Sequence, residues 1–405
     1  MQDTAHVNLA EAPTVTMPIE LRPTDCLPEL LAAARVAPIV RTPYLDQHAW
    51  VVCDRELVKQ ALTHPKLGKD VALAPDWMRQ PGQMVTAMPP PEYARMMVMS
   101  DGEHHARIRR IHAPVLSPRN TGRWSERVAA LVAGFLDNLD SADGTEVNLI
   151  TDYTQKIPLA FTAEMLGLPP GVERRLHDIT EVMLYSADYA LRQHAVGELF
   201  EAVQEWVRDP AELRDGVITG LLASTDGPDA RVTEGEAIVW TLSLIINGYE
   251  TTGSLISAAL YEALRRPAPE RPHTDEAVAA WIEETLRVQP PVPHTTWRFA
   301  LADLDLGGYL IPKGAPVQIS LAAANLDPDE AADSFDAQRR GRGHLSFGLG
   351  AHYCIGAPLA RVQTKIALRG FLRRFPQARL SADTAPRWES EWMIRRMSVL
   401  PVLLA

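Results

Sequence analysis

The sequence predicts a mainly α-helical protein with a small β-rich lobe. Between about residues 100 and 290, apolar residues recur at spacings of three and four, which is typical of helices with one buried face. Short alternating segments bounded by turn residues occur near residue 50 and again after residue 295, and they predict short strands. The helices therefore form the bulk of the molecule and the strands a smaller sheet region.

The central helices follow from this periodicity in order along the chain. The helical segments are residues 104–116, 125–139 and 196–207. A longer one starts at a capping box, Thr233 to Glu236, and ends before Pro267, so it predicts a single helix of about 33 residues and on the order of 50 Å. A helix over Asp275–Val288 and another that begins just after Cys354 and runs towards Phe375 complete the set.

The strands are short and lie at both ends of the helical region. They are expected within residues 48–53, 295–300, 306–312 and 317–321, where apolar residues alternate with polar ones between glycines and prolines. No linker, repeat or charge block divides the chain, although 405 residues would allow two or three domains.

Composition excludes several classes of protein. There are 40 basic and 51 acidic residues, for a net charge of −11, which argues against a nucleic-acid binder. Three widely spaced cysteines fit a reducing compartment and exclude a disulfide framework. The N-terminus lacks the pattern of a secretory signal, and the most apolar stretch, 237–246, is too short to span a membrane. We therefore expect a cytoplasmic protein without a membrane anchor.

A glycine-rich segment around Cys354 carries the main chemical signal. Gly348, Gly350 and Gly356 would let the backbone approach a bound group closely, and a helix-like stretch follows. A sulfur at the start of a helix faces unpaired N–H groups and the positive end of the helix dipole, which favour the metal-binding thiolate. A dinucleotide loop does not fit, because Tyr353 stands where its third glycine would be. Taken by itself, Cys354 would more often be a buried, inert cysteine.

The segment resembles the haem-binding signature of the cytochrome P-450 family, with its characteristic positions at Phe347, Gly348, Gly350, His352, Cys354 and Gly356. The resemblance covers most of the chain, since other family elements recur in the same order. It implies the P-450 fold as one domain over residues 1–405, a b-type haem, and Cys354 as the axial thiolate ligand of the iron. Phe347, Gly350 and Gly356 are then part of the haem-binding loop.

The resemblance also implies how the two haem propionates are held. A buried haem needs cations and hydrogen-bond donors at one edge. His105 and Arg109, one helical turn apart, resemble the family's propionate contacts, and Arg298 and His352 resemble the third and fourth. His104 is the alternative histidine. Each of these residues taken singly would more often be a solvated surface group.

Two further elements match the family. Glu284 and Arg287 resemble its ExxR pair, with Arg339 reaching the same carboxylate, and we assign them to fold and haem retention. Within the long helix, Gly248, Glu250 and Thr251 resemble the oxygen-binding site, in which Gly248 leaves room for dioxygen and the acid and alcohol supply protons.

The Thr251 hydroxyl has two possible roles. It either bonds back to the carbonyl of residue 247 or 248 and loosens the helix, or acts on the bound oxygen. The preceding position departs from the family, because Asn247 replaces the usual alanine or glycine. Its amide binds a polar substrate atom or water, or bonds within the helix, and the sequence does not decide between these.

The substrate side is expected on the strand that carries Arg298. Alternation would place Thr296 and His294 on its haem-facing side, towards the cavity, as candidate substrate contacts, although a solvent-exposed histidine is equally compatible. Only about fifty residues follow Cys354, so we expect electrons from NAD(P)H to arrive through a separate ferredoxin and ferredoxin reductase. A basic surface for that ferredoxin is expected from Arg107, Arg110, Arg340, Arg342, Arg361 and Lys365.

These observations lead to a haem-thiolate monooxygenase that activates dioxygen to hydroxylate or otherwise oxidise a small organic molecule, expected to be a natural-product intermediate. Within the same enzyme class, the alternative is oxidative coupling or ring formation without oxygen insertion. The alternative outside it is a non-catalytic haem sensor, which would not need the acid and alcohol.

Overall fold

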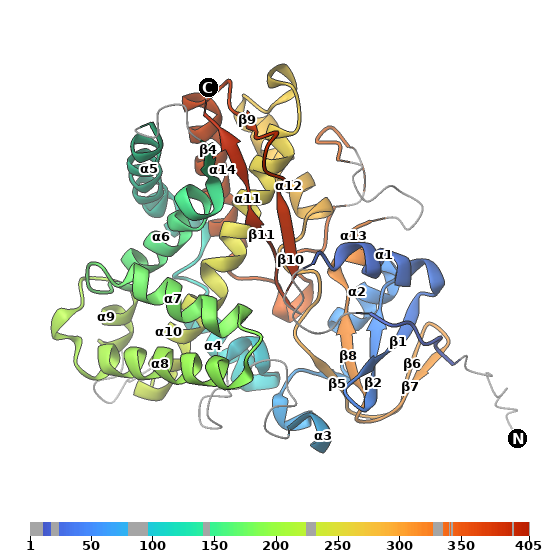
Figure 1. Cartoon of the computed structure of the whole chain (residues 1–405). Helices are drawn as coiled ribbons and strands as arrows, with labels where there is room; N and C mark the ends of the chain where they lie inside the picture. The colour runs from blue at the N-terminus through green and yellow to red at the C-terminus, as the bar shows by residue number, and fades with distance from the viewer. Residues whose placement is uncertain are drawn as a thin grey trace, which may run out of the picture.

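The computed structural model describes residues 11–17, 24–79, 96–140, 146–223, 232–326, 335–339, 341, 343–390 and 393–404. The predicted division into a helical bulk and a smaller sheet region is confirmed (Figure 1). The N-terminal elements are α1 (Leu27–Val36), β1 (Ile39–Tyr44), β2 (Gln47–Val52), α2 (Arg55–Thr63), β3 (Leu67–Gly68) and α3 (Asp76–Arg79). The central helices are α4 (Gly102–His112), α5 (Pro118–Asp140), α6 (Lys156–Leu166), α7 (Glu173–Tyr185), α8 (Tyr189–Arg208) and α9 (Val217–Leu222), with strand β4 (Glu146–Asn148) between α5 and α6.

The C-terminal half holds the elements that carry the motifs. They are α10 (Glu234–Gly248), α11 (Glu250–Leu264), α12 (Asp275–Val288), β5 (Arg298–Ala300), β6 (Leu304–Leu306), β7 (Tyr309–Ile311), β8 (Pro316–Ile319), α13 (Leu321–Asn325), α14 (Ala357–Arg374), β9 (Arg379–Leu380), β10 (Arg387–Ser390), β11 (Arg395–Val399) and β12 (Pro401–Leu403). The predicted bounds of the helix over Asp275–Val288 are confirmed, and so is the helix that follows Cys354.

The long helix predicted over residues 234–266 is wrong in one respect, because the structure contains two helices in its place. The capping box is present, with the Thr233 and Glu236 side chains each bonded to the other residue's backbone N–H. However, α10 ends at Gly248 and α11 begins at Glu250. Side-chain bonds to helix carbonyls around Gly248 compete with the regular ladder at this point, which accounts for the interruption.

The main sheet has five strands in the order β1-β2-β8-β5-β3. In Figure 1 it lies beside α1 and α2, on the opposite side of the molecule from α5 to α9. Strand β5 is antiparallel to both of its neighbours, with Arg298 opposite Val317 of β8 and Phe299 opposite Gly68 of β3. The sheet therefore brings residues near position 68 to the start of β5, far away in sequence.

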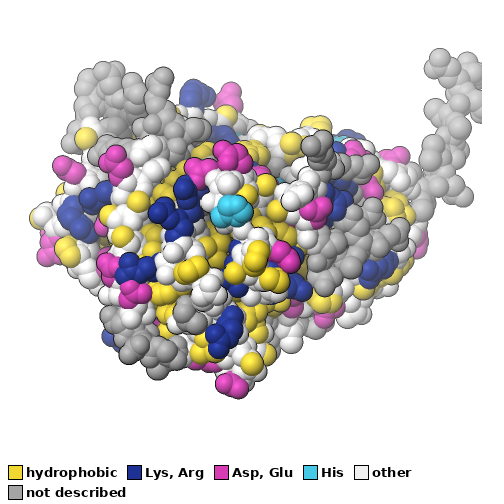
Figure 2. All heavy atoms as spheres, turned by 90° about the horizontal axis from the view of Figure 1, so that it is seen from above, with side chains coloured by type: hydrophobic (Ala, Val, Ile, Leu, Met, Phe, Trp, Pro, Cys, Tyr) yellow, Lys and Arg dark blue, Asp and Glu magenta, His cyan; other side chains and the backbone are white. Residues whose placement is uncertain are grey.

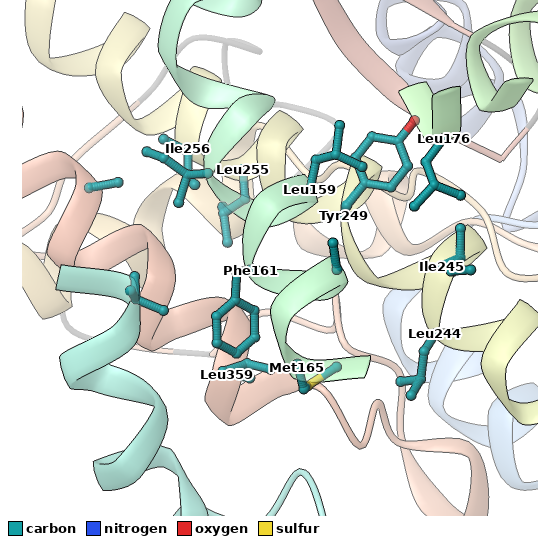
Figure 3. Close-up of a cluster of buried hydrophobic side chains, with 14 of the residues drawn as sticks. Leu159, Phe161, Met165, Leu176, Leu244, Ile245, Tyr249, Leu255, Ile256 and Leu359 are labelled. Atoms are coloured by element: carbon teal, nitrogen blue, oxygen red, sulfur yellow. The ribbon is translucent and has the colours of Figure 1, made fainter. Parts of the chain in front are cut away.

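The largest hydrophobic core joins α6 to α10 and α11. Figure 3 shows side chains of α6 facing those of α10 and α11. The labelled residues are Leu159, Phe161, Met165, Leu176, Leu244, Ile245, Tyr249, Leu255, Ile256 and Leu359. Each buried side chain of this size contributes about 1.5–3 kcal/mol relative to exposure, so the core holds α10 and α11 firmly in place. In the part of the chain that the structure describes, no helix combines the length and apolar character needed to cross a membrane.

Candidate haem-thiolate active site

The cysteine loop folds back on itself directly before α14. The Cys354 N–H donates to the Phe347 carbonyl oxygen at 2.9 Å, which closes the loop. Gly348 and Gly350 have φ values of +72° and +75°, a region that other residues adopt only with strain. A Cβ added to Gly350 would also lie 2.8 Å from Thr63 Cγ2, so that position has no room for a side chain. Two of the three glycines are thus required by backbone geometry.

The Cys354 sulfur lies where the sequence places it, at the start of α14. The backbone N–H groups of Gly356 and Ala357 donate to it, as expected for a helix start. Burial nevertheless raises the pKa of the Cys354 thiol, although those two N–H groups and the cations of Arg109 and Arg361 act in the opposite direction. The two N–H groups act in the direction that the helix-start argument expects, by lowering the pKa, but they do not outweigh the loss of solvation. A coordinated metal ion supplies what is missing, because it deprotonates a thiol ligand outright.

Basic groups from four segments converge beside this loop. The rings of His105 (α4) and His352 lie 4.1 Å apart between centroids. Asp101 Oδ1 lies 3.4 Å from His352 Nε2, while the other carboxylate oxygen of Asp101 accepts the backbone N–H of Lys69. The Arg298 guanidinium donates to the carbonyl oxygens of residues 62 and 67, at 3.0 and 3.2 Å. The three predicted residues of this group are thus brought together, along with two that the sequence did not reveal.

Lys69 and Asp101 are those two residues. One step beyond the Gly68–Phe299 pair, the antiparallel register places Lys69 opposite Arg298, and like charges in such positions repel each other. Both side chains are buried, and burial lowers the pKa of Lys69 to about 7. A lysine after a two-residue strand gives no sequence signal of its own, so only the fold reveals it.

This arrangement fits a haem with two propionates. In the described part of the chain, neither Lys69 nor Arg298 pairs with a carboxylate, and the buried atoms His105 Nε2 and Arg298 Nε have no hydrogen-bond partner. These buried cations and hydrogen-bond donors outnumber the single carboxylate described beside them, that of Asp101. An additional anionic group is therefore needed to pair with them. Two carboxylates at the edge of a flat group that reaches Cys354 satisfy that requirement. Arg109 lies next to the loop, where it donates to the Tyr353 carbonyl oxygen at 2.7 Å.

Two ion networks support the cysteine loop, and the first of them is buried. Glu284 and Arg287 form a bidentate pair at 2.8 and 2.9 Å, and the Asp336 N–H donates to the same carboxylate. The contact expected from Arg339 stays a prediction. A second network was not expected, in which Glu283 of α12 binds Arg361 of α14 and His344 of the loop, the latter at 3.0 Å. The loop is thereby tied to both helices, as a retained haem would require.

The interruption between α10 and α11 lies at the predicted oxygen site. The Thr251 hydroxyl donates to the Asn247 carbonyl oxygen at 2.8 Å, which confirms the first of its two possible roles. The Asn247 side-chain amide donates to the Ser243 carbonyl oxygen at 2.8 Å, so of the alternatives for Asn247 the structure shows the bond within the helix. A Cβ added to Gly248 would be in ordinary van der Waals contact with Thr162 Oγ1, at 3.6 Å, so a methyl group would fit here without a clash.

Glu250 lies at the centre of a buried polar network. Its Oε1 atom accepts from Tyr185 Oη at 2.9 Å and Gln155 Nε2 at 3.1 Å, and lies 3.4 Å from Arg396 Nη1. Arg396, from β11, also binds Glu181 at 2.5 and 2.7 Å, and the Glu181 side chain is 38% exposed. The network therefore connects the buried Glu250 carboxylate to the surface.

Opposing effects set the protonation of Glu250. Burial raises its pKa, while the Arg396 charge and the Tyr185 hydrogen bond lower it, and the net direction is upward. A carboxyl group with a raised pKa holds its proton more strongly than an exposed glutamate does, which suits a proton donor. Arg396 lies 146 residues away along the chain. For that reason the local motif gave no indication of it.

The candidate substrate residues are placed differently from the expectation. Strand β5 begins only at Arg298, and residues 295–297 are irregular, so the alternation argument for Thr296 and His294 is wrong. His294 is buried and forms a single bridge with Ser320, and its Nδ1 has no hydrogen-bond partner in the described structure. Burial lowers the pKa of His294 to about 4, so it is neutral at physiological pH. Thr296 is half-buried, with its hydroxyl 3.5 Å from the Val98 carbonyl oxygen.

The expected basic surface is weaker than its sequence suggested. Arg107 pairs with Glu236, Arg361 with Glu283, and Lys365 with Asp275. Arg340 and Arg342 lie outside the described residues. Cationic and anionic side chains are also interspersed on the face that Figure 2 shows. Much of the predicted positive charge is thus neutralised within the protein.

Comparison with known proteins agrees with this geometry. Residues 189–400 match the family described as Cytochrome P450. The chain is 31% identical over 387 residues to the cytochrome P-450 monooxygenase DoxA of Streptomyces sp. strain C5, covering 88% of this chain and 89% of that one. It is also 30% identical over 388 residues to the 6-deoxyerythronolide B hydroxylase of Saccharopolyspora erythraea, covering 91% and 93%.

Solved structures show the same fold. CYP154A1 from Streptomyces coelicolor A3(2) superposes with a TM-score of 0.84 at 30% identity, over 97% of this chain and 100% of that one. CxnD, described as acting in C–S bond formation in chuangxinmycin biosynthesis, gives a TM-score of 0.84 at 25% identity, over 97% and 98%. The chain belongs to the cytochrome P450 family and is a P450 monooxygenase with a haem-thiolate cofactor.

Proposed function

We propose that this protein hydroxylates or otherwise oxidises a natural-product intermediate, with electrons delivered by separate redox proteins. The observation that carries the proposal is the convergence beside the Cys354 loop of His105, Lys69 and Arg298, buried basic side chains from three distant segments that form no ion pair in the described structure. Two relatives support the substrate class, since one is described as a 6-deoxyerythronolide B hydroxylase and another as a mycinamicin IV hydroxylase/epoxidase.

In this proposal Cys354 would bind the haem iron, and His105, Arg109, Arg298 and His352 would hold the propionates together with Lys69. The Cys-ligated haem supplies dioxygen activation and O–O bond cleavage when bound. Phe347, Gly350 and Gly356 shape the loop against it. The buried base cluster fixes the orientation of the cofactor, because its unpaired donors are satisfied only when the carboxylates lie between them.

Protons reach the oxygen site through side chains of this chain. Glu250 holds a proton one residue from Thr251, in hydrogen-bonding distance of Tyr185 and Gln155, and Arg396 orients its carboxylate. The Thr251 hydroxyl, bonded to the Asn247 carbonyl oxygen, passes it on to the oxygen site. Acid and alcohol act in sequence, as a relay for two successive protons requires.

Three residues are proposed to contact the substrate. Asn247 presents an exposed side chain at the helix interruption, and His294 and Thr296 lie where the chain leaves α12 and enters β5. Because His294 is neutral and has an unpaired ring nitrogen, it exchanges a hydrogen bond with a polar group of the substrate rather than binding an anion.

Electrons are proposed to come from NAD(P)H through a ferredoxin reductase and a ferredoxin. Arg110 is exposed and lies on the same helix as His105 and Arg109. In this proposal it contacts an acidic ferredoxin that docks on the cysteine side of the haem. Charge reversal of Arg340 and Arg342 should also raise a salt-sensitive Michaelis constant for ferredoxin, and no change would count against a role for these two arginines.

The test of the proposed function is Thr251→Ala in the haem-loaded enzyme. Haem content and the carbon monoxide spectrum should be unchanged, while product formation per electron consumed falls by about tenfold or more. Thr252→Val is the matched control, because the Thr252 hydroxyl also bonds to a carbonyl four residues earlier, that of Gly248 at 3.0 Å. Full turnover by Thr251→Ala would remove Thr251 from the relay, and haem binding without turnover by the native enzyme in a broad substrate screen would favour a sensor.

A second candidate function is bond formation without oxygen insertion. The likeness to CxnD favours it, because that structure is described as a P450 for C–S bond formation. Products formed under isotopically labelled dioxygen separate the two functions. Label in the product supports monooxygenation, and unlabelled product that has lost two hydrogens supports coupling.

A further inference from the structure

The chain enters α6 through a single π-helical turn, η4 (Ile150–Thr154). The Gln155 N–H donates to the carbonyl oxygen of Ile150, five residues earlier, at 3.2 Å. Turns of this kind are rare inside helices and occur frequently at functional sites. The Thr154 hydroxyl bonds to the Ser257 hydroxyl of α11 at 2.8 Å, which docks the turn on that helix. Gln155 therefore lies directly beside α11, the helix that begins at the proposed oxygen site.

The Gln155 carboxamide and Gly253 of α11 fit closely against each other. A Cβ added to Gly253 would clash with the carboxamide, so the amide occupies the volume that any other residue at this position would fill. From there Gln155 Nε2 donates to Glu250 Oε1 at 3.1 Å. Gln155 itself is buried, so the surrounding protein restricts its movement. The absence of a side chain at Gly253 is thus what allows Gln155 to reach the acid.

The two oxygen atoms of the Glu250 carboxyl group have different surroundings. Oε1 faces Tyr185 Oη at 2.9 Å, Gln155 Nε2 at 3.1 Å and Arg396 Nη1 at 3.4 Å. In the described structure Oε2 makes no hydrogen bond, yet it is not among the unpartnered atoms that are closed off from water. The nitrogens of Arg396 and of the Gln155 amide only donate, so Oε1 is an acceptor and has no room for a proton of its own. A neutral Glu250 therefore carries its proton on Oε2.

We propose that Gln155 is a positioning residue of the proton relay. Packed against Gly253, it joins Tyr185 and Arg396 at Glu250 Oε1 and so directs the transferable proton to Oε2. The inference rests on the proposed function, because it treats Glu250 as the acid of the relay. It goes further by assigning the proton to one oxygen atom and by giving a role to Gln155, which lies 95 residues from Glu250 along the chain.

This arrangement gives each oxygen of Glu250 a separate task. The proton on Oε2 is shared with no other group of the described chain, so when the O–H bond breaks a water molecule at Oε2 accepts it. The negative charge that remains is stabilised at Oε1 by Arg396, Tyr185 and Gln155. A proton from the water side then restores the acid. Burial, supported by the Glu181 charge, raises the pKa of Glu250 against the effect of Arg396, which favours that return to the neutral form.

Infrared spectroscopy of the haem-loaded enzyme in heavy water tests where the proton lies. A protonated carboxyl group has a C=O stretching band, and the wavenumber of that band falls with each hydrogen bond that the carbonyl oxygen accepts. The difference between spectra recorded at about pH 5 and about pH 9 should contain such a band for Glu250. Glu250→Gln should remove it, which assigns the band to this residue.

Two variants should move this band to higher wavenumber if Oε1 is the carbonyl oxygen. Gln155→Met keeps the size of the side chain and removes the donor, so the carbonyl loses one hydrogen bond. Gly253→Ala leaves Gln155 in the chain but displaces its carboxamide, and it should move the band in the same direction. The second variant tests the same contact from the other helix, so the result does not depend on Gln155→Met alone.

Thr154→Val is the matched control, because it removes a buried hydrogen bond between the same π-helical turn and α11 without touching Glu250. It should leave the band in place. A band that Gln155→Met does not move would put the proton on Oε1 and overturn the inference, as would an equal shift in Thr154→Val or the absence of any Glu250 band. Full turnover by Thr251→Ala would instead contradict the proposed relay without moving the band, so the two failures are distinct.

Discussion

The buried network around Glu250 gives the sharpest prediction about stability, through Arg396→Gln. The guanidinium joins three carboxylates, those of Glu181, Glu250 and Glu389, and lies over the Tyr185 ring at 3.3 Å. Glu181 and Glu389 are 38% and 22% exposed, so each pair contributes at most about 1 kcal/mol. Glu250 is only 1% exposed, so the loss of the Arg396 cation beside it should account for most of the decrease in stability.

The magnitude follows from the cost of leaving a buried charge without its partner. Such changes typically cost about 3–5 kcal/mol. Unfolding entropy scales with length and reaches about 0.85 kcal/mol per degree for 405 residues, so the melting temperature should fall by about 4–6 °C at pH 8.

The pH dependence has a definite sign. Burial raises the pKa of Glu250 in the folded state, so this group contributes stability below its unfolded pKa and loses it as pH rises through the folded pKa. Arg396 opposes that rise in pKa, and its removal moves the folded pKa further upward. The deficit of Arg396→Gln should therefore be largest near pH 8 and shrink towards pH 5.

Thermal unfolding of four proteins tests this reasoning: the native chain, Arg396→Gln, Glu250→Gln and the double variant. Arg396→Gln should cost clearly less stability in the Glu250→Gln background. The control is Arg395→Gln, which breaks a pair with Asp25 on the other side of β11 and should cost the same in both backgrounds. An Arg396→Gln deficit that is independent of both pH and Glu250 would refute the coupling.

The remaining predictions concern three other positions. In Gly253→Ala the new Cβ would clash with Gln155 Oε1, so the Gln155 amide should move away from Glu250. The melting temperature should then fall by an amount equivalent to about 1–2 kcal/mol. No change in calorimetry would show that Gln155 adapts freely. Burial lowers the pKa of Lys69 in the folded state, so Lys69→Met should stabilise the haem-free protein, and increasingly so as pH falls from about 10 towards 7. In the haem-loaded protein the same change should speed the transfer of haem to apomyoglobin. A slower or equal rate of transfer would argue against a role for Lys69 in holding the haem. Because φ is +75° at Gly350, Gly350→Ala should lower the free energy of unfolding by at least about 1 kcal/mol and lower the haem content. Urea unfolding and haem titration curves identical to those of the native protein would contradict this prediction.

The sequence alone predicted the structure correctly where a feature depends on residues that are close together in the chain. The loop around Cys354, the Glu284–Arg287 pair and the helix bounds around them all depend on residues a few positions apart. Periodicity and turn residues likewise predicted a helical bulk with a small sheet. The Thr251 hydroxyl bond to a carbonyl four residues earlier was one of two stated possibilities, and the structure selects it.

The remainder depended on pairings between distant segments. Lys69 meets Arg298 only because β3 pairs with β5, and Arg396 meets Glu250 only because β11 packs near α11. The predicted long helix missed the interruption at Tyr249, because helix propensity does not account for side chains that bond to helix carbonyls. His294 and Thr296 were assigned to a strand that in fact starts later, since strand ends are set by the neighbouring strands.

The most direct test of the central claim is the carbon monoxide spectrum of the reduced, purified protein. Ligation by the Cys354 sulfur predicts one tightly bound haem per chain and the strongly red-shifted Soret absorption of a thiolate-ligated iron–carbon monoxide complex. Cys354→His should lose that band. A native protein that takes up no haem, or shows a globin-like band, would contradict the assignment.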